Sequence, residues 1–233
     1  MEDTIKLNSE NLIDYVMFKL NKEKNEFIIQ ELDTIDEVLI NFNNEIDNSY
    51  LSDITYFHNL KAITFRNGFI NNDILKVLIK FEHLTSITFD NCAFEEEKLI
   101  ASLNLKELSL ISCQINDYSF VYIIDSLEIL SIINGEVEIN KLNLLKNLRY
   151  LEITNSRILD NTKINISNIH ELYIDNTSIK DLTFLNELNS LEKVSIDENQ
   201  YEDNKLLVKE LINKGISFYN QSISPIVGDD YGE

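Results

Sequence analysis

Apolar residues recur along this chain in groups of three that share one internal spacing. The stretch NIHELYIDNTSIKDLTFLNELNSLEKVSI, residues 168–196, contains two such groups, 22 residues apart: Ile169, Leu172 and Ile174, then Leu191, Val194 and Ile196. The last two members of each group stand two positions apart, which is typical of a strand that buries one face. The pattern therefore predicts a repeated unit built around a short strand.

Eight groups of this kind follow one another at intervals of 21 to 25 residues, and their first members are Ile35, Leu60, Leu84, Leu105, Leu127, Leu148, Ile169 and Leu191. Three positions after the last apolar residue of each group stands a small or amide residue: Asn43, Gly68, Cys92, Cys113, Gly135, Ser156, Thr177 and Asn199. One such unit cannot bury its apolar face alone, whereas stacked units can. A solenoid is therefore predicted.

These positions follow the pattern L-x-x-L-x-L-x-x-N/C-x-L, and the chain resembles the leucine-rich-repeat family over about residues 35–219. The segment SIKDLTFLNELNSLEKVSI is similar to the 21- to 22-residue repeats of internalin-type bacterial proteins. The resemblance implies an α/β solenoid, a horseshoe with about eight short parallel strands. It also implies that strand residues between the apolar positions point to the concave face.

The ends of such a stack need covers, and the chain offers one at each end. Residues 1–34 are predicted to form an N-terminal helical cap, in which the spacing of Ile13, Val16, Met17 and Leu20 marks an amphipathic helix. The repeats are assigned to residues 35–201 and a C-terminal helix-strand cap to residues 202–219.

The C-terminal cap is predicted to begin with a helix at Asp203 that ends before Gly215 and is followed by a strand over residues 216–219. Its apolar face consists of Leu207, Val208, Leu211 and Ile212. Residues 220–233 form an acidic tail without periodicity, which is expected to be mobile or to become ordered on a partner.

The composition narrows the choice of partner. Lys and Arg total 20 against 40 Asp and Glu, which gives a formal net charge of −20. This charge repels nucleic acid and anionic membranes, and it favours a basic protein as partner; the alternative is that the acidity only keeps the protein soluble. No secretory leader and no apolar stretch of membrane-spanning length is visible, so a cytoplasmic protein, monomeric when free, is expected.

Catalytic chemistry is not indicated. Each of the three histidines stands alone, and no Gly-rich phosphate loop, nucleophile elbow or H-E-x-x-H motif is present. Cys92 and Cys113 occupy the same position in adjacent repeats, within possible reach of a disulfide or a shared metal. The family resemblance instead implies buried thiols that satisfy backbone groups. We expect no catalytic residue, no metal site and no cofactor.

The concave face can be assigned from the alignment of the repeats. Seven of its 24 positions are carboxylates and two, Arg66 and Lys193, are basic. An exposed apolar and aromatic patch is expected at its centre, formed by Ile111, Ile129, Ile133, Tyr150 and Tyr173 and flanked by Glu107, Glu152, Glu171 and Asp175. An apolar centre within a charged surround is typical of protein-binding hot spots. The alternative is the general preference of strands for β-branched and aromatic residues.

Three functions remain open on the sequence alone. The first hypothesis is a non-enzymatic binding protein whose acidic concave face engages a basic protein, as an immunity protein that inhibits a bacterial toxin would. The second is a bacterial effector or adaptor that docks a host or regulatory protein. The third, an enzyme, would require Cys92 and Cys113 or an acidic pair to be reactive.

Overall fold

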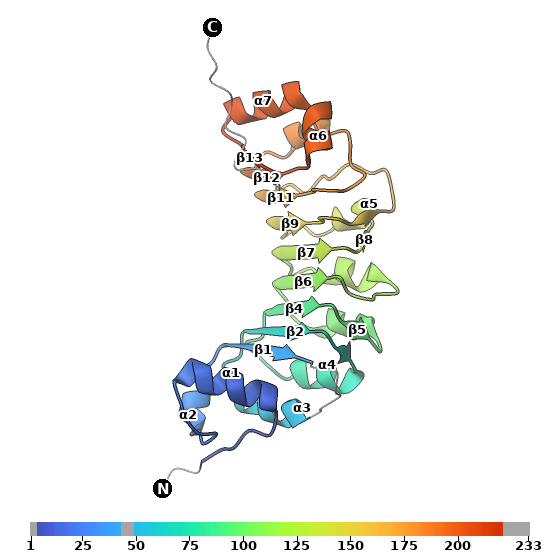
Figure 1. Ribbon diagram of the computed structural model, residues 1–233. Coiled ribbons are helices and arrows are strands. Elements are labelled where there is room, and N and C mark those ends of the chain that lie inside the picture. The colour runs from blue at the N-terminus through green and yellow to red at the C-terminus, as the bar shows by residue number, and fades with distance from the viewer. Residues whose placement is uncertain (1–3, 43–48, 221–233) are drawn as a thin grey trace. The chain divides into compact units, whose positions relative to one another are not determined.

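The computed structural model describes residues 4–42 and 49–220 of the 233-residue chain (Figure 1). The chain forms two compact units that divide between Val121 and Tyr122. Within the described ranges, no helix combines the length and the apolar character needed to cross a membrane. The predicted acidic tail, except for Asn220, and Asn43 of the first repeat lie outside the described residues.

The first unit contains a parallel sheet with one strand from each repeat (Figure 1). Its strands, in spatial order, are β1 (Glu37–Asn41), β2 (Ala62–Arg66), β4 (Ser86–Asp90) and β6 (Glu107–Ile111). The predicted apolar residues pair in register and form two buried columns: Val38, Ile63, Ile87 and Leu108, and then Ile40, Phe65, Phe89 and Leu110. The repeat alignment therefore gives the correct register for this unit.

Aromatic stacking reinforces the second of these columns. The rings of Phe42 and Phe65 are stacked with centroids 6.0 Å apart, and those of Phe65 and Phe89 with centroids 5.7 Å apart. A Cβ atom on Gly68 would lie 2.0 Å from Cδ2 of Phe42, so this turn needs a glycine to let the ring pack.

The second unit continues the same design with shorter strands. They are β7 (Ile129–Ile133), β9 (Tyr150–Glu152), β11 (Glu171–Tyr173), β12 (Lys193–Ser195) and β13 (Ser217–Tyr219), all parallel and in this spatial order. Leu130, Leu151, Leu172, Val194 and Phe218 pair in register and are buried. The strand predicted over residues 216–219 thus extends the sheet of this unit.

The chain returns from each strand to the next through short elements of mixed type. Two small parallel pairs join β3 (Phe69–Ile70) to β5 (Ala93–Phe94) and β8 (Glu136–Val137) to β10 (Arg157–Ile158). The helical return elements are α4 (Asn72–Leu78), η2 (Glu97–Ser102), η3 (Tyr118–Ile123), α5 (Ile139–Leu142) and η4 (Thr183–Glu187). Such varied returns are compatible with one strand register, because only the apolar positions must align.

The turns after β2, β4, β6, β7, β9 and β11 are each built on a left-handed residue. These six residues have φ between 52° and 57°: Asn67, Asn91, Ser112, Asn134, Asn155 and Asn176. Asparagine tolerates this conformation because its short polar side chain can hydrogen-bond locally. The side-chain amide of Asn67 donates to Asn41 at 3.0 Å, and that of Asn91 donates to Asn67 at 2.9 Å.

The next residue of the turn satisfies backbone carbonyls of the repeat before it. The thiol of Cys92 donates to the carbonyl of Phe65 at 3.5 Å, and that of Cys113 donates to the carbonyl of Phe89 at 3.2 Å. Ser156 does the same with its hydroxyl, 2.8 Å from the carbonyl of Ile132. Both thiols are free; Cys92 is buried and Cys113 is half-buried. Both cysteines bond backbone carbonyls as predicted, but only Cys92 is fully buried.

The last repeat departs from the predicted phase. Asn199 was expected at the turn position, but it is exposed on α6 (Glu198–Asp203), and the buried Gln200 takes its place. The amide of Gln200 donates to the carbonyl of Ile174 at 3.1 Å. The phase shifts because Asp197 caps α6 and accepts a hydrogen bond from the backbone N–H of Gln200.

The N-terminal elements are α1 (Glu10–Leu20), α2 (Ile29–Leu32), α3 (Ser49–Asp53) and η1 (Ile54–Tyr56), and α1 packs against β1. The buried residues of α1 are Leu12 and Val16, whereas Ile13, Met17 and Leu20 are only half-buried. The predicted buried face of this helix is therefore rotated by about one residue. The buried carboxylate of Asp53 accepts hydrogen bonds from the backbone N–H groups of Asn8 and Ser9, which anchors the entry to α1.

The C-terminal helix begins later than predicted. The chain breaks at Asn204, and α7 runs over Lys205–Asn213 rather than starting at Asp203. Val208 and Leu211 are buried, as expected from the apolar spacing, and Gly215 adopts φ 95° before β13. The physical reason for the later start is that α6 uses the preceding residues for its own capped turn.

Substitution of Leu151 tests the stacked column. Leu151→Asp places a carboxylate among fully buried leucines, and it should destabilise the second unit by on the order of 4 kcal/mol. The measurement is the melting temperature by circular dichroism. Arg149→Asp, at an exposed position two residues earlier, is the matched control and should melt like the parent protein. Equal melting of both variants would contradict the register.

Thiol alkylation tests the turn cysteines. Burial raises the pKa of the Cys113 thiol to about 12 and also raises the pKa of the Cys92 thiol. Because the thiolate is the nucleophile, iodoacetamide at about pH 8 should label the native protein on the order of 100-fold more slowly than free cysteine. The denatured protein is the control and should label at the rate of free cysteine. Rapid labelling of the native chain would show that the thiols are reactive.

Candidate protein-binding surface

The strands of the second unit present two rows of side chains on the face opposite the core. Successive side chains of a strand point to opposite faces, so the residues on either side of the buried column share the outer face. In register, one row consists of Ile129, Tyr150, Glu171, Lys193 and Ser217. The other row consists of Ser131, Glu152, Tyr173, Ser195 and Tyr219.

Tyr150, Glu152, Glu171 and Tyr173 form one cluster, which we call the tyrosine–glutamate cluster. Tyr150 pairs in register with Glu171, and Glu152 with Tyr173, so each tyrosine has a glutamate opposite it. The two rings meet across the diagonal, with centroids 5.1 Å apart and planes tilted by 34°. Each hydroxyl donates to the glutamate on its own strand, Tyr150 to Glu152 at 3.2 Å and Tyr173 to Glu171 at 2.9 Å.

Lys193 completes one side of this cluster. Its ammonium lies 3.3 Å from Oε2 of Glu171, 5.2 Å from the ring centroid of Tyr173 and 5.1 Å from that of Tyr219. The expected binding patch included neither Lys193 nor Tyr219. Tyr219 could have been found by treating the predicted C-terminal strand as a ninth rung with the same register.

The two tyrosines and Lys193 keep their ordinary charge states at neutral pH. Burial raises the pKa of Tyr150, and the nearby charge of Glu152 raises it further. Burial is also the main cause that raises the pKa of Tyr173. Contact with the Tyr173 hydroxyl and with Glu171 raises the pKa of Lys193. The tyrosines therefore remain neutral hydrogen-bond donors, and the lysine remains a cation.

Glu152 differs from Glu171 in its neighbours. Three hydroxyls donate to its carboxylate, from Ser131 at 3.0 Å, Tyr150 at 3.2 Å and Thr154 at 3.0 Å. Within the described ranges no lysine, arginine or histidine forms an ion pair with it, whereas Glu171 is paired with Lys193. Among the described residues, the hydrogen-bond donors to the Glu152 carboxylate are therefore neutral hydroxyl groups.

The remaining predicted patch residues have different positions. Ile129 and Ile133 are half-buried on β7, and Ile129 pairs in register with Tyr150. Glu107 is exposed and Ile111 half-buried on β6, which belongs to the first unit. The structure therefore places Ile129 beside the tyrosine–glutamate cluster and does not place Glu107 and Ile111 relative to it.

Asp175 was expected to flank the patch with an exposed carboxylate, and this expectation is wrong. Only 1% of Asp175 is exposed. The first unit has five-residue strands, which keep the corresponding position on the face, but β11 ends at Tyr173. Asp175 therefore falls in the turn, immediately before the left-handed Asn176, and is buried there. Thr154, at the same position after β9, is also buried, and its hydroxyl donates to Glu152 on the outer face.

On the first unit, three charged residues of the face, Glu37, Arg66 and Asp90, are compensated by neighbours. Arg66 forms an ion pair with Asp90 at 3.1 Å, and Glu37 forms one with Lys19 of α1 at 2.5 Å. Two of the three histidines are also paired locally, His58 2.9 Å from Asp33 and His170 3.0 Å from Glu192. Among the described residues, no group of three or more His, Cys, Asp or Glu is arranged to hold a metal.

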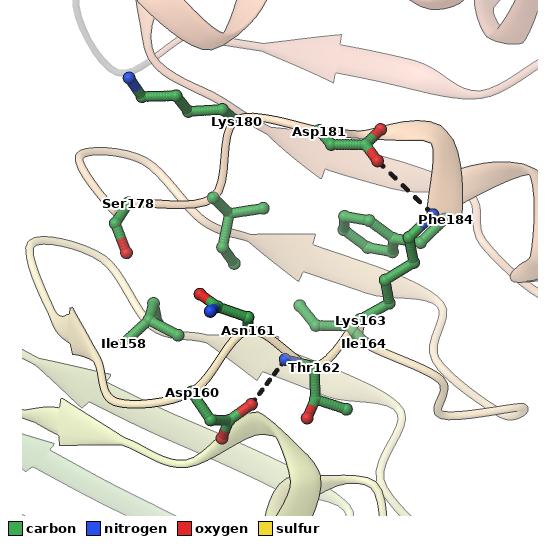
Figure 2. A pocket seen from close by; sticks show the side chains of 11 residues that line it. Ile158, Asp160, Asn161, Thr162, Lys163, Ile164, Ser178, Lys180, Asp181 and Phe184 are labelled. Atoms are coloured by element: carbon green, nitrogen blue, oxygen red, sulfur yellow. Dashed lines mark hydrogen bonds and ion pairs between the residues drawn. The ribbon is translucent and has the colours of Figure 1, made fainter.

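A hollow of about 210 Å³ lies among the return segments of the second unit, lined by Asp160, Lys163, Asp181 and Phe184 among others (Figure 2). Two of its charged groups bind each other, Lys163 lying 3.5 Å from Asp181, and Asp160 accepts a hydrogen bond from the backbone N–H of Thr162 at 2.7 Å. Hydrogen bonds from Thr183 also hold the pKa of Asp181 below its usual range. The hollow therefore offers little unused polar chemistry compared with the cluster.

Comparison with solved structures identifies the fold. Internalin C2 from Listeria monocytogenes superposes with a TM-score of 0.61 at 22% identity, covering 86% of this chain and 93% of that one. Another internalin of the same organism, InlF, gives a TM-score of 0.59 at 22% identity, with 81% of this chain and 56% of that one covered. No protein-family model and no curated protein sequence matches the chain. The predicted leucine-rich-repeat fold is confirmed.

Proposed function

We propose that this chain is a non-enzymatic protein-binding module that captures a basic protein on the tyrosine–glutamate cluster of its second unit. The observation that carries the proposal is a pair of half-buried tyrosines, with ring centroids 5.1 Å apart, beside a carboxylate that forms no ion pair with any of the described residues. Tyrosine is enriched at binding hot spots because it combines a large apolar area with a hydrogen-bonding group. The extended face of a repeat solenoid is a common binding surface for proteins.

The net charge of −20 supports a basic partner, since complementary charge accelerates encounter and disfavours wrong partners. A strongly acidic binding module of this size suits an immunity protein that covers the basic active cleft of a bacterial toxin in the cytoplasm. The same face would also serve an effector or adaptor that docks a regulatory protein. The two differ in whether the captured partner is toxic when it is produced alone.

Capture from a lysate of the native cell tests the proposal. Tyr150→Ala combined with Tyr173→Ala should reduce retention of the basic partner at least tenfold, because both aromatic surfaces are lost. The control is Phe18→Ala combined with Leu206→Ala, which removes two side chains that are 82% and 80% exposed elsewhere. Circular dichroism confirms that each variant is folded before capture is compared.

Three results would separate the alternatives. Release of a basic protein by added salt, with loss of capture only in the tyrosine variant, supports the proposed surface. Growth arrest by the partner alone, reversed by co-production of this chain, supports the immunity role, whereas a harmless partner supports the adaptor role. Equal capture by both variants would show that binding does not use the cluster.

A further inference from the structure

The face of the second unit contains its own example of a bound cation. The ammonium of Lys193 lies against the rings of Tyr173 and Tyr219 and on the carboxylate of Glu171. Attraction between a cation and a tyrosine ring is enhanced where the group is partly removed from water, and Lys193 is half-buried. Two aromatic faces and one carboxylate therefore suffice on this surface to hold a cation.

One rung earlier, the same kinds of groups are present without the cation. Glu152 supplies the carboxylate, and the rings of Tyr150 and Tyr173 lie beside it on the same face. A carboxylate has about four acceptor positions, and the hydroxyls of Ser131, Tyr150 and Thr154 use three of them. One acceptor position is left for an outside donor.

This inference rests on the proposed function. We propose that Glu152 receives one arginine side chain of the partner protein, whose guanidinium stacks on Tyr150 while donating to the carboxylate. The planar guanidinium fits better than an ammonium because it can stack on a ring and donate from its edge at the same time. The hydroxyls around Glu152 fix its carboxylate in position before the arginine arrives. Glu171 does not compete, because Lys193 already compensates its charge.

The blocked tripeptide acetyl-Gly-Arg-Gly-amide is a direct probe of this site. Its binding can be followed by NMR through the ring signals of the tyrosines, with acetyl-Gly-Gly-Gly-amide as the reference ligand. Glu152→Gln should weaken binding of the arginine peptide at least tenfold. Glu187→Gln is the control, since it removes the same charge from an exposed position on η4, and it should change binding less than twofold.

Removing the internal cation provides a second, independent test. Lys193→Ala frees Glu171 between Tyr173 and Tyr219, so the protein should gain a second site of the same kind. The expected result is a rise in the number of arginine peptides bound from one to two, with the added ring shifts at Tyr219. Unchanged stoichiometry, or Glu152→Gln binding like the parent protein, would overturn the inference.

Capture experiments can distinguish a failure of the arginine site from a failure of the proposed binding surface. If the partner is captured normally by Glu152→Gln but lost with the paired tyrosine substitutions, the binding face stands and the arginine site is wrong. If capture by Glu152→Gln falls at least tenfold while that by Glu187→Gln does not, the arginine site is supported. If neither the tyrosine nor the Glu152 substitution affects capture, both proposals fail.

Discussion

The structure depends on in-register stacking of equivalent apolar side chains from successive parallel strands. In the second unit this column contains Leu130, Leu151, Leu172, Val194 and Phe218. A slip of one residue between two strands would turn a buried leucine outward and a tyrosine or glutamate inward, so burial of the column enforces the register. The same constraint aligns the outer face, because each outer side chain is the immediate neighbour of a stacked one.

Periodicity was therefore enough to predict much of the site. Once Leu151 and Leu172 are aligned, Tyr150 must stand beside Glu171, and Glu152 beside Tyr173. No knowledge of the return segments is needed for this, and their variety confirms that they do not control the register. The turn residues were predictable for a similar reason, since the carbonyls left by each strand end recur at the same place and need a donor each time.

What periodicity could not show is where each strand ends. The alternation of faces holds only while the backbone remains extended, and β9, β11 and β12 each have three residues where the strands of the first unit have five. Asp175 was misplaced because it lies beyond that limit. Gln200 was missed because capping of α6 by Asp197 shifts the last turn by one residue. Both errors arise where a strand gives way to a turn or a helix. The spacing of apolar residues carries no information about where this change occurs.

The distribution of charge on the outer face follows from the same geometry. A formal charge of −20 suggests a uniformly acidic surface, yet Glu37, Asp90 and Glu171 are each paired with a basic side chain of the chain itself. A partner gains little binding free energy by contacting a charge in such an internal pair. Breaking the pair costs about as much free energy as the new contact provides. The recognition that we propose therefore uses a carboxylate that accepts hydrogen bonds from hydroxyls. Glu152 is such a carboxylate, and its place between two tyrosines gives an approaching cation both a charge and an apolar surface to contact.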